Sequence, residues 1–242
     1  MKQCYGLKQM ADRLLVVEDE KNLGLTLVSQ LKLKGYEVSW AKSAEEAYLE
    51  LTNKKHNLVL LDVGLPDQSG FEVAKYIRNH HRSVAVVFLT AMGSPEDRIR
   101  GLEIGAEDYM VKPFHLKELF LRIQNALKRT QYLLSISSAV SDIATIGQAT
   151  IYFSRFEAVK DGAITPLTHK ECALLKLLAE RKGRAVSRDE ILDQICQNDE
   201  TLSLRTIDNF IMRLRRVVEK NPEKPEIIKS VRGVGYQLNE FI

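Results

Sequence analysis

Five polar side chains follow apolar runs in the first half of the chain, where they could act together in phosphoryl chemistry. Carboxyl ends of parallel strands meet at one edge of a sheet, so side chains placed there would converge. Three of the five are carboxylates, whose repulsion a hard divalent cation such as Mg²⁺ would relieve. One carboxylate could then attack a phosphorus atom in line to give an acyl phosphate, while an ammonium and a hydroxyl hold phosphoryl oxygens. The residues are Glu18, Asp19, Asp62 as the nucleophile, Thr90 and Lys112.

Taken singly, each of these residues has an ordinary structural interpretation. Acids after a strand often cap the next helix, and a threonine or lysine at a strand end is common on a protein surface. The coincidence at successive strand ends is what favours a shared site.

The first half of the chain is predicted to alternate between strands and helices, which would position these side chains. A buried central strand is predicted within NLVLLDVGLPDQSGF, where four apolar residues precede Asp62 and a Gly/Pro cluster ends the run. Five βα units with short connections predict a doubly wound parallel α/β sheet of the flavodoxin type. Strands are expected in RLLVVEDE, YEVSWA, LVLL, VAVVFLT and EDYMV, and helices over Lys21–Lys34, after the caps Ser43, Ser69 and Ser94, and over Leu116–Arg129.

The second half predicts a smaller α+β domain. Tyr132–Ile143 breaks the periodicity with small polar residues, which indicates a linker over 131–143 between domains at 13–130 and 144–242. Short strands are expected in ATIYFS, FEAVK and AITPL, with a hairpin turn at Asp161-Gly162. Helices over Thr168–Glu180, Ser187–Ile195 and Leu204–Lys220, followed by a glycine-containing hairpin in IIKSVRGVGYQLNEF, form the layout of a winged helix-turn-helix.

Composition narrows the class of protein. The 242 residues contain no apolar run long enough for a membrane span and no signal-peptide core, so we expect a soluble, cytoplasmic protein. Three widely spaced cysteines indicate reduced thiols rather than disulfides. The net charge of +3 is modest, but Arg205–Arg232 holds eight Lys/Arg against four Asp/Glu, which favours a nucleic-acid partner for this segment.

The motifs VVEDE, LLDVGLPDQSGF, FLTA, DYMVKPF, RTIDNFIMRLRRVVE and SVRGVGYQL occur in this order, and with them the chain resembles two-component response regulators of the OmpR/PhoB group. The resemblance implies that Asp62 is the phosphoacceptor. It also implies that Asp19 and Asp62 bind Mg²⁺ directly, Glu18 through water, and Gly64 through its carbonyl. Gly64 is smaller than the residue usual there, so we expect a more exposed phosphoryl group with a changed lifetime.

The same resemblance implies a switch and a dimer face. Thr90 and Tyr109 match the pair in which a hydroxyl drawn to the phosphoryl group lets an aromatic ring turn inward. Charges on the fourth helix, fifth strand and fifth helix match a symmetric dimer face, and a twofold axis would present each pair twice. The expected pairs are Arg98 with Glu118, Glu103 with Arg122, and Asp108 with Arg129.

The helix predicted from Leu204 would be the DNA-recognition helix. Its apolar residues form one stripe, and Arg205, Asn209, Met212 and Arg216 lie opposite, with Asp208, Arg213 and Arg215 on the flanks. In the major groove Asn reads adenine, and Arg reads guanine or holds phosphate. The resemblance adds Thr206 to the DNA-contacting set, and the following hairpin offers Ser230, Arg232 and Tyr236.

Together these features predict a transcription regulator, not an enzyme, that a sensor histidine kinase phosphorylates. Phosphorylation would promote homodimerisation and binding to tandem half-sites in promoter DNA, and the resemblance places the loop QNDETLS toward RNA polymerase. A phosphatase of the haloacid dehalogenase type is an alternative, but it needs a second Asp where Gly64 stands. A DNA-binding protein independent of phosphorylation is the other alternative, which the intact acidic set disfavours.

Overall fold

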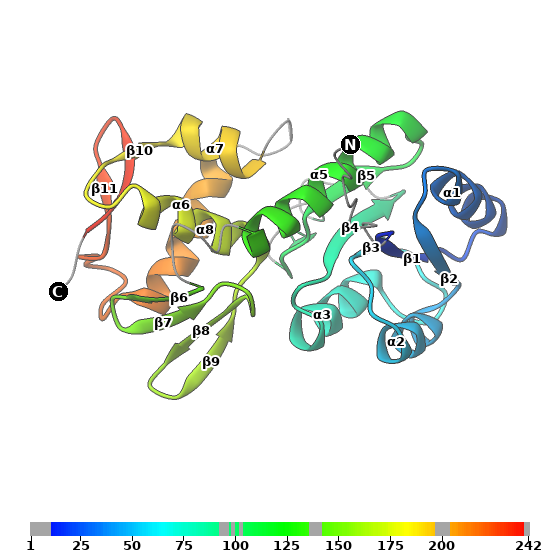
Figure 1. Cartoon of the computed structure of the whole chain (residues 1–242), viewed down its shortest axis with the longest axis horizontal. Helices are drawn as coiled ribbons and strands as arrows, with labels where there is room; N and C mark the ends of the chain where they lie inside the picture. Colours follow the sequence, from blue (N-terminus) through cyan, green and yellow to red (C-terminus); the bar gives the residue numbers. More distant parts are fainter. Residues whose placement is uncertain are drawn as a thin grey trace, which may run out of the picture.

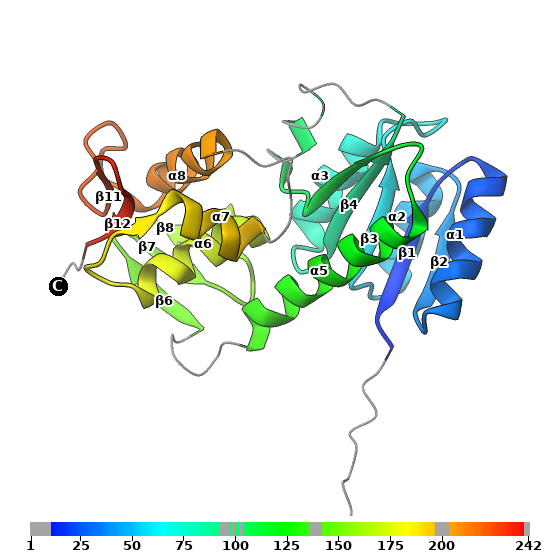
Figure 2. The same ribbon diagram turned by 90° about the horizontal axis from the view of Figure 1, so that it is seen from above.

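The computed structural model describes residues 11–91, 97, 100–101, 104–135, 142–196 and 204–239, with the backbone alone at 129–135, 196 and 204–205. Two domains lie side by side, and the long helix α5 (Leu116–Ser135) runs from the first toward the second (Figures 1 and 2).

The N-terminal domain is built on a five-stranded parallel sheet. Its strands are β1 (Arg13–Val17), β2 (Glu37–Ala41), β3 (Leu58–Asp62), β4 (Ala85–Thr90) and β5 (Asp108–Val111). Their order is β2-β1-β3-β4-β5, with the chain reversing its winding direction next to β1. This order confirms the predicted doubly wound sheet, and it brings the carboxyl ends of β1 and β3 together as neighbours.

Helices cover both faces of this sheet. Figure 1 shows α1 (Lys21–Leu33) and α5 on one face, and α2 (Ala44–Asn53) and α3 (Gly70–His80) on the other. Ser43 and Ser69 cap α2 and α3 as predicted, since their hydroxyls accept hydrogen bonds from the first-turn amides of Glu46 and Phe71. The predicted cap Ser94 lies outside the described residues.

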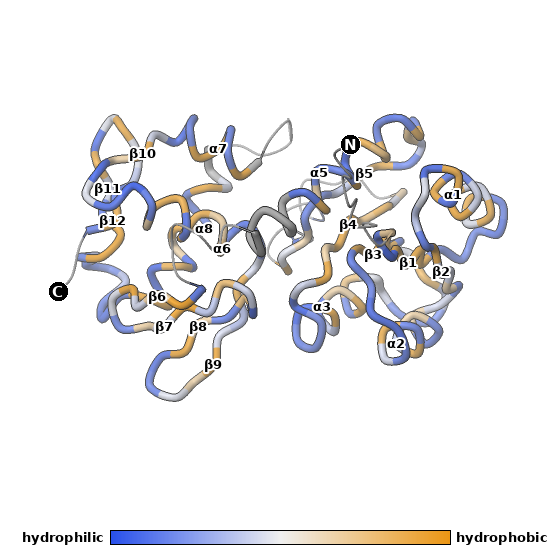
Figure 3. Tube along the Cα trace, in the orientation of Figure 1, coloured by the Kyte–Doolittle hydropathy of each residue, from blue (hydrophilic) through white to orange (hydrophobic). Residues whose placement is uncertain are grey.

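The burial of β3 on both faces explains why its sequence is a continuous apolar run. All five of its residues are buried, with Leu58 and Leu60 packed toward α1 and α5, and Val59 and Leu61 packed toward α2 and α3. Burying one such side chain stabilises the fold by about 1.5–3 kcal/mol. In Figure 3 the apolar segments accordingly gather along the central strands, which makes this edge of the sheet a rigid support for Asp62.

Helix α5 is longer than the predicted helix over Leu116–Arg129. Helix α5 continues to Ser135, so residues 131–135 of the predicted linker are helical, and β6 begins at Ile143, its predicted last residue. The segment 130–135 contains neither Gly nor Pro, and small polar residues alone did not end the helix.

The C-terminal domain begins with a four-stranded antiparallel sheet of β6 (Ile143–Ile146), β7 (Ala149–Tyr152), β8 (Glu157–Lys160) and β9 (Ala163–Pro166). Asp161 and Gly162 both have positive φ, which confirms the tight turn between β8 and β9. The sequence analysis identified three of these strands and missed β6.

Three helices and a second small sheet complete the domain. Helices α6 (His169–Glu180), α7 (Arg188–Cys196) and α8 (Leu204–Val218) lie close to their predicted bounds. The hairpin of β11 (Ile228–Val231) and β12 (Gly235–Leu238) is confirmed, and β12 also pairs with the short strand β10 (Val186–Ser187). This is the winged helix-turn-helix layout, with α8 as its third helix. Within the described part of the chain, no helix is long and apolar enough to cross a lipid bilayer.

Candidate functional site

Three carboxylates meet at the carboxyl edge of the N-terminal sheet. Glu18 and Asp19 follow β1, and Asp62 ends β3; one oxygen of each lies within 4.8 Å of the others. Glu18 is fully buried and Asp62 nearly so, while Asp19 faces solvent. Oxygen donors of this number, charge and spacing fit a hard divalent cation such as Mg²⁺. The structure therefore brings together the predicted carboxylates.

Lys112 joins two of these carboxylates. Its Nζ donates to Asp62 Oδ2 at 2.6 Å and to Glu18 Oε2 at 2.7 Å. Burial acts to lower the pKa of Lys112, but its hydrogen bonds to the two carboxylates outweigh burial and raise it. Burial raises the pKa of Glu18, against the opposing hydrogen bond from Lys112. A cation on a flexible stem thus lies against the predicted nucleophile, where it could follow an incoming phosphoryl oxygen.

The loop after Asp62 is fixed by glycines and by an aspartate. Gly64 N donates to Asp62 Oδ1 at 3.0 Å, and a Cβ on Gly70 would lie 2.1 Å from the carbonyl oxygen of Asp62, so only glycine fits there. A Cβ on Gly64 would meet only Asp62 Oδ1, at 3.9 Å. The space beside the carboxylate is therefore open, as the small residue predicted.

The two predicted switch residues are both buried. Thr90 ends β4 and is 1% exposed, and Tyr109 in β5 is 4% exposed. The Tyr109 ring centroid lies 5.9 Å from that of Phe88, and a Cβ on Gly101 would come within 3.2 Å of both rings. The aromatic side chain is therefore turned inward in this structure.

On the predicted dimer face, Arg122 is satisfied within its own domain. Its Nη1 donates to both carboxylate oxygens of Asp108, at 2.9 and 2.8 Å, and its Nη2 pairs with Glu118 at 2.8 Å. Asp108 and Glu118 raise the pKa of Arg122 despite the opposing effect of burial. Arg98 and Glu103 lie outside the described residues, and Arg129 is described only as backbone in α5.

Helix α8 presents the expected polar face. Ile207, Phe210, Ile211, Leu214 and Val218 are buried in the domain core, with Val217 partly buried against it, as predicted for the apolar stripe. Asn209 and Arg216 are exposed, and Met212 is 48% exposed, on the opposite side. Arg205, predicted for the same face, is described only as backbone, and Thr206 is half-buried.

Residues on the flanks of α8 bind other parts of the same domain. Arg213 pairs with Glu171 of α6 at 2.9 Å. Arg215 donates to the Ile228 carbonyl at 2.7 Å and to Ser230 Oγ at 3.0 Å. These contacts fasten α8 to α6 and to the hairpin.

The hairpin aromatic has a bracing role that the sequence did not indicate. Tyr236 is 4% exposed, its hydroxyl donates to Asp208 Oδ1 at 2.5 Å, and Arg188 reaches both. Burial, together with the hydrogen bond to Asp208, raises the pKa of Tyr236. Arg232, at the tip of the hairpin beside Gly233, is exposed.

Two residues near the acidic cluster were missed by the sequence analysis. Trp40 Nε1 donates to the Glu18 carbonyl at 2.9 Å, and the Asp67 carboxylate accepts from the amides of Ala44 and Glu45 at 2.9 and 3.0 Å. The first fixes the end of β1, and the second ties the loop after Asp62 to the start of α2. A signal existed only for Asp67, because acids favour helix N-termini.

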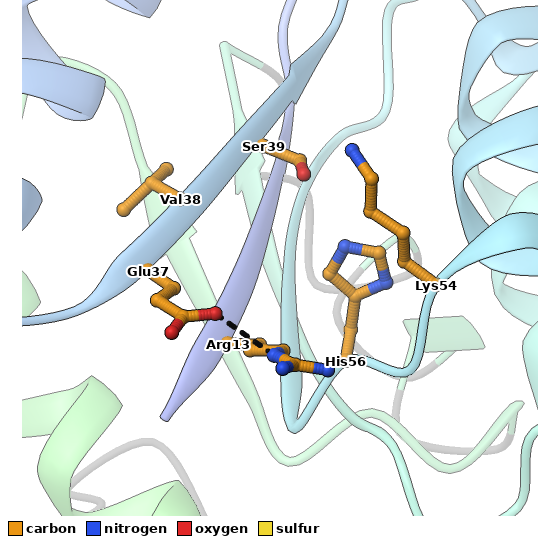
Figure 4. Close-up of a pocket in the computed structure, with 6 residues that line it drawn as sticks. All are labelled: Arg13, Glu37, Val38, Ser39, Lys54 and His56. Carbon is orange, nitrogen blue, oxygen red and sulfur yellow. Dashed lines mark hydrogen bonds and ion pairs between the residues drawn. The ribbon is translucent and has the colours of Figure 1, made fainter. Parts of the chain in front are cut away.

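A concavity lies at the opposite, amino-terminal edge of the sheet (Figure 4). Glu37 and Ser39 of β2 face Lys54 and His56 across it, and Glu37 pairs with Arg13 at 2.8 Å. Lys54 pairs with Glu50, so the charges here are largely compensated. The acidic edge, and not this groove, is the candidate reaction site.

Comparison with known families matches both domains. Residues 14–124 match the response regulator receiver domain, and residues 162–238 match the family described as transcriptional regulatory protein, C terminal.

Relatives align over nearly the whole chain. The chain is 38% identical over 227 residues to a probable transcriptional regulator, ycf27, of Cyanophora paradoxa, covering 93% of this chain and 95% of that one. It is 36% identical over 235 residues to the alkaline phosphatase synthesis transcriptional regulatory protein PhoP of Bacillus subtilis, covering 96% and 98%.

Two solved structures are also similar to the chain over nearly its whole length. The response regulator DrrB, an OmpR/PhoB homologue of Thermotoga maritima, is 30% identical with a TM-score of 0.51, covering 96% of this chain and 100% of that one. A mutant of RitR, 23% identical with a TM-score of 0.78 and the same coverage, shares the fold. With the acidic edge and the winged helix already described, these matches show that the chain belongs to the OmpR/PhoB family of response regulators, which join a receiver domain to a DNA-binding effector domain that regulates transcription.

Proposed function

We propose that a sensor histidine kinase transfers a phosphoryl group to Asp62, and that this transfer controls promoter binding by the effector domain in the cytoplasm. The observation that carries the proposal is the contact of Lys112 Nζ with both Asp62 and Glu18 at the edge of the sheet. It supports the proposal because it joins the Asp62 carboxylate, a second acid and a cation within one small site.

In the transfer step, an Asp62 carboxylate oxygen attacks the phosphorus atom of the kinase's phosphohistidine. The new P–O bond forms as the P–N bond breaks, and the imidazole leaves with the bonding pair. Lys112 moves from Asp62 to a phosphoryl oxygen, and the Thr90 hydroxyl donates to another. When bound at Glu18, Asp19, Asp62 and the Gly64 carbonyl, Mg²⁺ supplies positive charge that offsets the charge of the phosphoryl group.

The output of the proposed switch is a symmetric dimer on promoter DNA. Arg122 would exchange Asp108 and Glu118 of its own domain for Glu103 of a second copy, alongside the Arg98–Glu118 and Asp108–Arg129 pairs. The opposite signs of the charges that the sequence carries in this region support the arrangement. Two effector domains would then meet two tandem half-sites.

On the DNA, α8 would enter the major groove and the hairpin would follow the backbone or the minor groove. The exposed Asn209, Met212 and Arg216 would contact bases or phosphates, together with Arg205, Thr206, Arg213 and Arg215. Ser230 and Arg232 would contact the backbone, while Asp208 and Tyr236 would hold the helix and the hairpin in register. The segment expected to meet RNA polymerase, QNDETLS, lies outside the described residues.

Labelling with a small phosphodonor tests the phosphoryl step. Incubation with acetyl phosphate and Mg²⁺, followed by mass spectrometry of proteolytic fragments, should place one acid-stable, base-labile phosphoryl group on Asp62. Asp62→Asn should abolish labelling, whereas Asp193→Asn, which changes an exposed carboxylate in the effector domain, should not. Labelling that persists in Asp62→Asn, or that is absent from the wild-type chain, would contradict the proposal.

A further inference from the structure

One apolar side chain lies on the exposed face of α8. Met212 is 48% exposed, whereas the other large apolar side chains described in this helix are buried or half-buried in the domain core. A single exposed apolar residue is ordinary on a protein surface, so its meaning depends on its neighbours. Met212 stands among polar neighbours, on the face that the proposed docking turns toward DNA.

Two arginines beside Met212 are held within the domain. Arg213 pairs at 2.9 Å with Glu171, whose side chain is 2% exposed. Arg215 donates to two acceptors in the hairpin strand β11. Turning either guanidinium toward a base would break these bonds, and for Arg213 it would leave a buried carboxylate without its cation. Reading of bases by the middle of α8 therefore falls to the side chains that face outward.

Asn209, Met212 and Arg216 form this outward stripe. They are spaced by three and four residues, so they lie on one face of the helix, and all three are exposed. Asn209 and Met212 are about 4.5 Å apart along the helix axis, which is comparable with the rise of about 3.4 Å per base pair. With α8 in the major groove, Met212 therefore meets a base pair close to the pair that Asn209 meets.

One group in the major groove suits an apolar side chain. The edges of adenine, guanine and cytosine present hydrogen-bond donors and acceptors, whereas thymine adds a methyl group at C5. A methionine against a polar edge displaces water from these donors and acceptors and offers no strong hydrogen bond in return. Against the methyl group, the same side chain buries apolar surface on both partners, and its flexible thioether adjusts to the position of the base.

We propose that Met212 is a specificity-determining residue, which selects a thymine in each half-site by packing against its C5 methyl group. The inference rests on the proposed function, in which α8 enters the major groove. The expected half-site has this thymine close to the adenine that Asn209 reads. Because Met212 supplies this preference without a charge, its contribution to affinity should depend little on salt concentration.

Removal of single methyl groups from the DNA tests the inference with the full-length chain. A duplex is selected with the wild-type chain from a random-sequence library, and each thymine is replaced in turn by deoxyuridine, which lacks only the C5 methyl group. Fluorescence anisotropy should find one thymine in each half-site whose replacement weakens binding about fourfold, the effect expected for one buried methyl group. In Met212→Ala, the same replacement should leave affinity unchanged.

A methyl group restored on a different base should return affinity. Changing the sensitive T·A pair to C·G should weaken binding by the wild-type chain, and 5-methylcytosine in place of that cytosine should recover part of the loss. Met212→Ala should bind the cytosine and 5-methylcytosine duplexes equally. Met212→Leu, which keeps an apolar side chain at this position, should still distinguish them.

Ile164→Ala is the matched control. Ile164 is 58% exposed on β9, the outer strand of the four-stranded sheet, so this change also removes an exposed apolar side chain from the effector domain. The variant should bind the selected duplex as the wild type does. It should also keep the full effect of deoxyuridine at the sensitive thymine.

The outcomes separate this inference from the proposed function. If no thymine replacement weakens binding, or if the replacement weakens Met212→Ala as much as the wild type, Met212 does not read the methyl group. A loss of affinity in Asn209→Ala alongside such a result would leave the docking of α8 in place. If Asn209→Ala and Met212→Ala both bind the selected duplex as the wild type does, the docking of α8 is contradicted and the inference fails with it.

Discussion

Replacing Lys112 with alanine should destabilise the receiver domain markedly in the absence of a divalent cation. The variant loses two charge-assisted hydrogen bonds, at 2.6 and 2.7 Å, and leaves the fully buried Glu18 beside Asp62. Each such bond contributes roughly 1.5–3 kcal/mol. Because the Lys112 side chain is 16% exposed and water relieves part of the loss, we expect the free energy of unfolding to fall by about 3 kcal/mol.

Urea unfolding followed by tryptophan fluorescence measures this change. Trp40 is the sole tryptophan and lies in β2, so its emission reports on the receiver domain. With a urea dependence of about 1.5 kcal/mol per molar, the midpoint in EDTA should fall by about 2 M. Added MgCl₂ should stabilise Lys112→Ala more than the wild type, since the cation no longer competes with an ammonium.

Lys75→Ala is the matched control. It removes a lysine whose pair with Glu72 is half exposed on α3, which should change stability by less than about 0.5 kcal/mol. A midpoint for Lys112→Ala within error of Lys75→Ala would refute the view that Lys112 holds the acidic site together.

Further predictions concern pH, phosphoryl lifetime and DNA binding. Burial lowers the pKa of His56 in the folded state. Below about pH 6.5 the unfolded chain therefore binds more protons than the folded chain, so the stability of the receiver domain should decrease as the pH is lowered. Urea midpoints at several pH values should show a smaller decrease in His56→Gln than in the wild type. Gly64→Met should change the rate at which phosphate is released from labelled Asp62, and an unchanged rate would disprove the role of the open space. Asn209→Ala should weaken binding to a DNA duplex selected with the wild-type chain from a random-sequence library by about 1–3 kcal/mol, with loss of base preference. Arg232→Ala should weaken binding to all duplexes alike and lower the slope of log affinity against log salt concentration by about one. Fluorescence anisotropy measures both effects.

The sequence carried enough information to predict the acidic edge because its geometry follows from strand ends. Asp62 ends β3 and Lys112 follows β5, and the hydrogen-bond register of the parallel strands β3, β4 and β5 aligns these strand ends. No side-chain detail was needed to bring them together. The buried stripe of α8 was predictable for a similar reason, since the helical period alone places Ile207, Phe210 and Leu214 on one face.

The features that were missed depend on contacts between distant segments. The two-residue strand β10 exists only through pairing with β12, and the bracing of Tyr236 requires Asp208 and Arg188 from two helices. The contact between Glu107 and His169 joins residues 62 positions apart in different domains. Neither local propensity nor spacing records such pairings. The predicted end of α5 at Arg129 differs from the observed end at Ser135 for a local reason, because polar residues alone do not end a helix.

Sedimentation of the purified chain with Mg²⁺, with and without beryllofluoride as a mimic of the phosphoryl group, tests the central claim most directly. The account predicts a monomer that becomes a dimer on addition of beryllofluoride, with no shift in Asp62→Ala or in Arg122→Glu. If dimerisation is lost in Asp62→Ala but persists in Arg122→Glu, the result would support the switch and contradict the assigned dimer face. A wild-type chain that binds DNA equally well with or without beryllofluoride, and shows no change in sedimentation, would contradict control by phosphorylation.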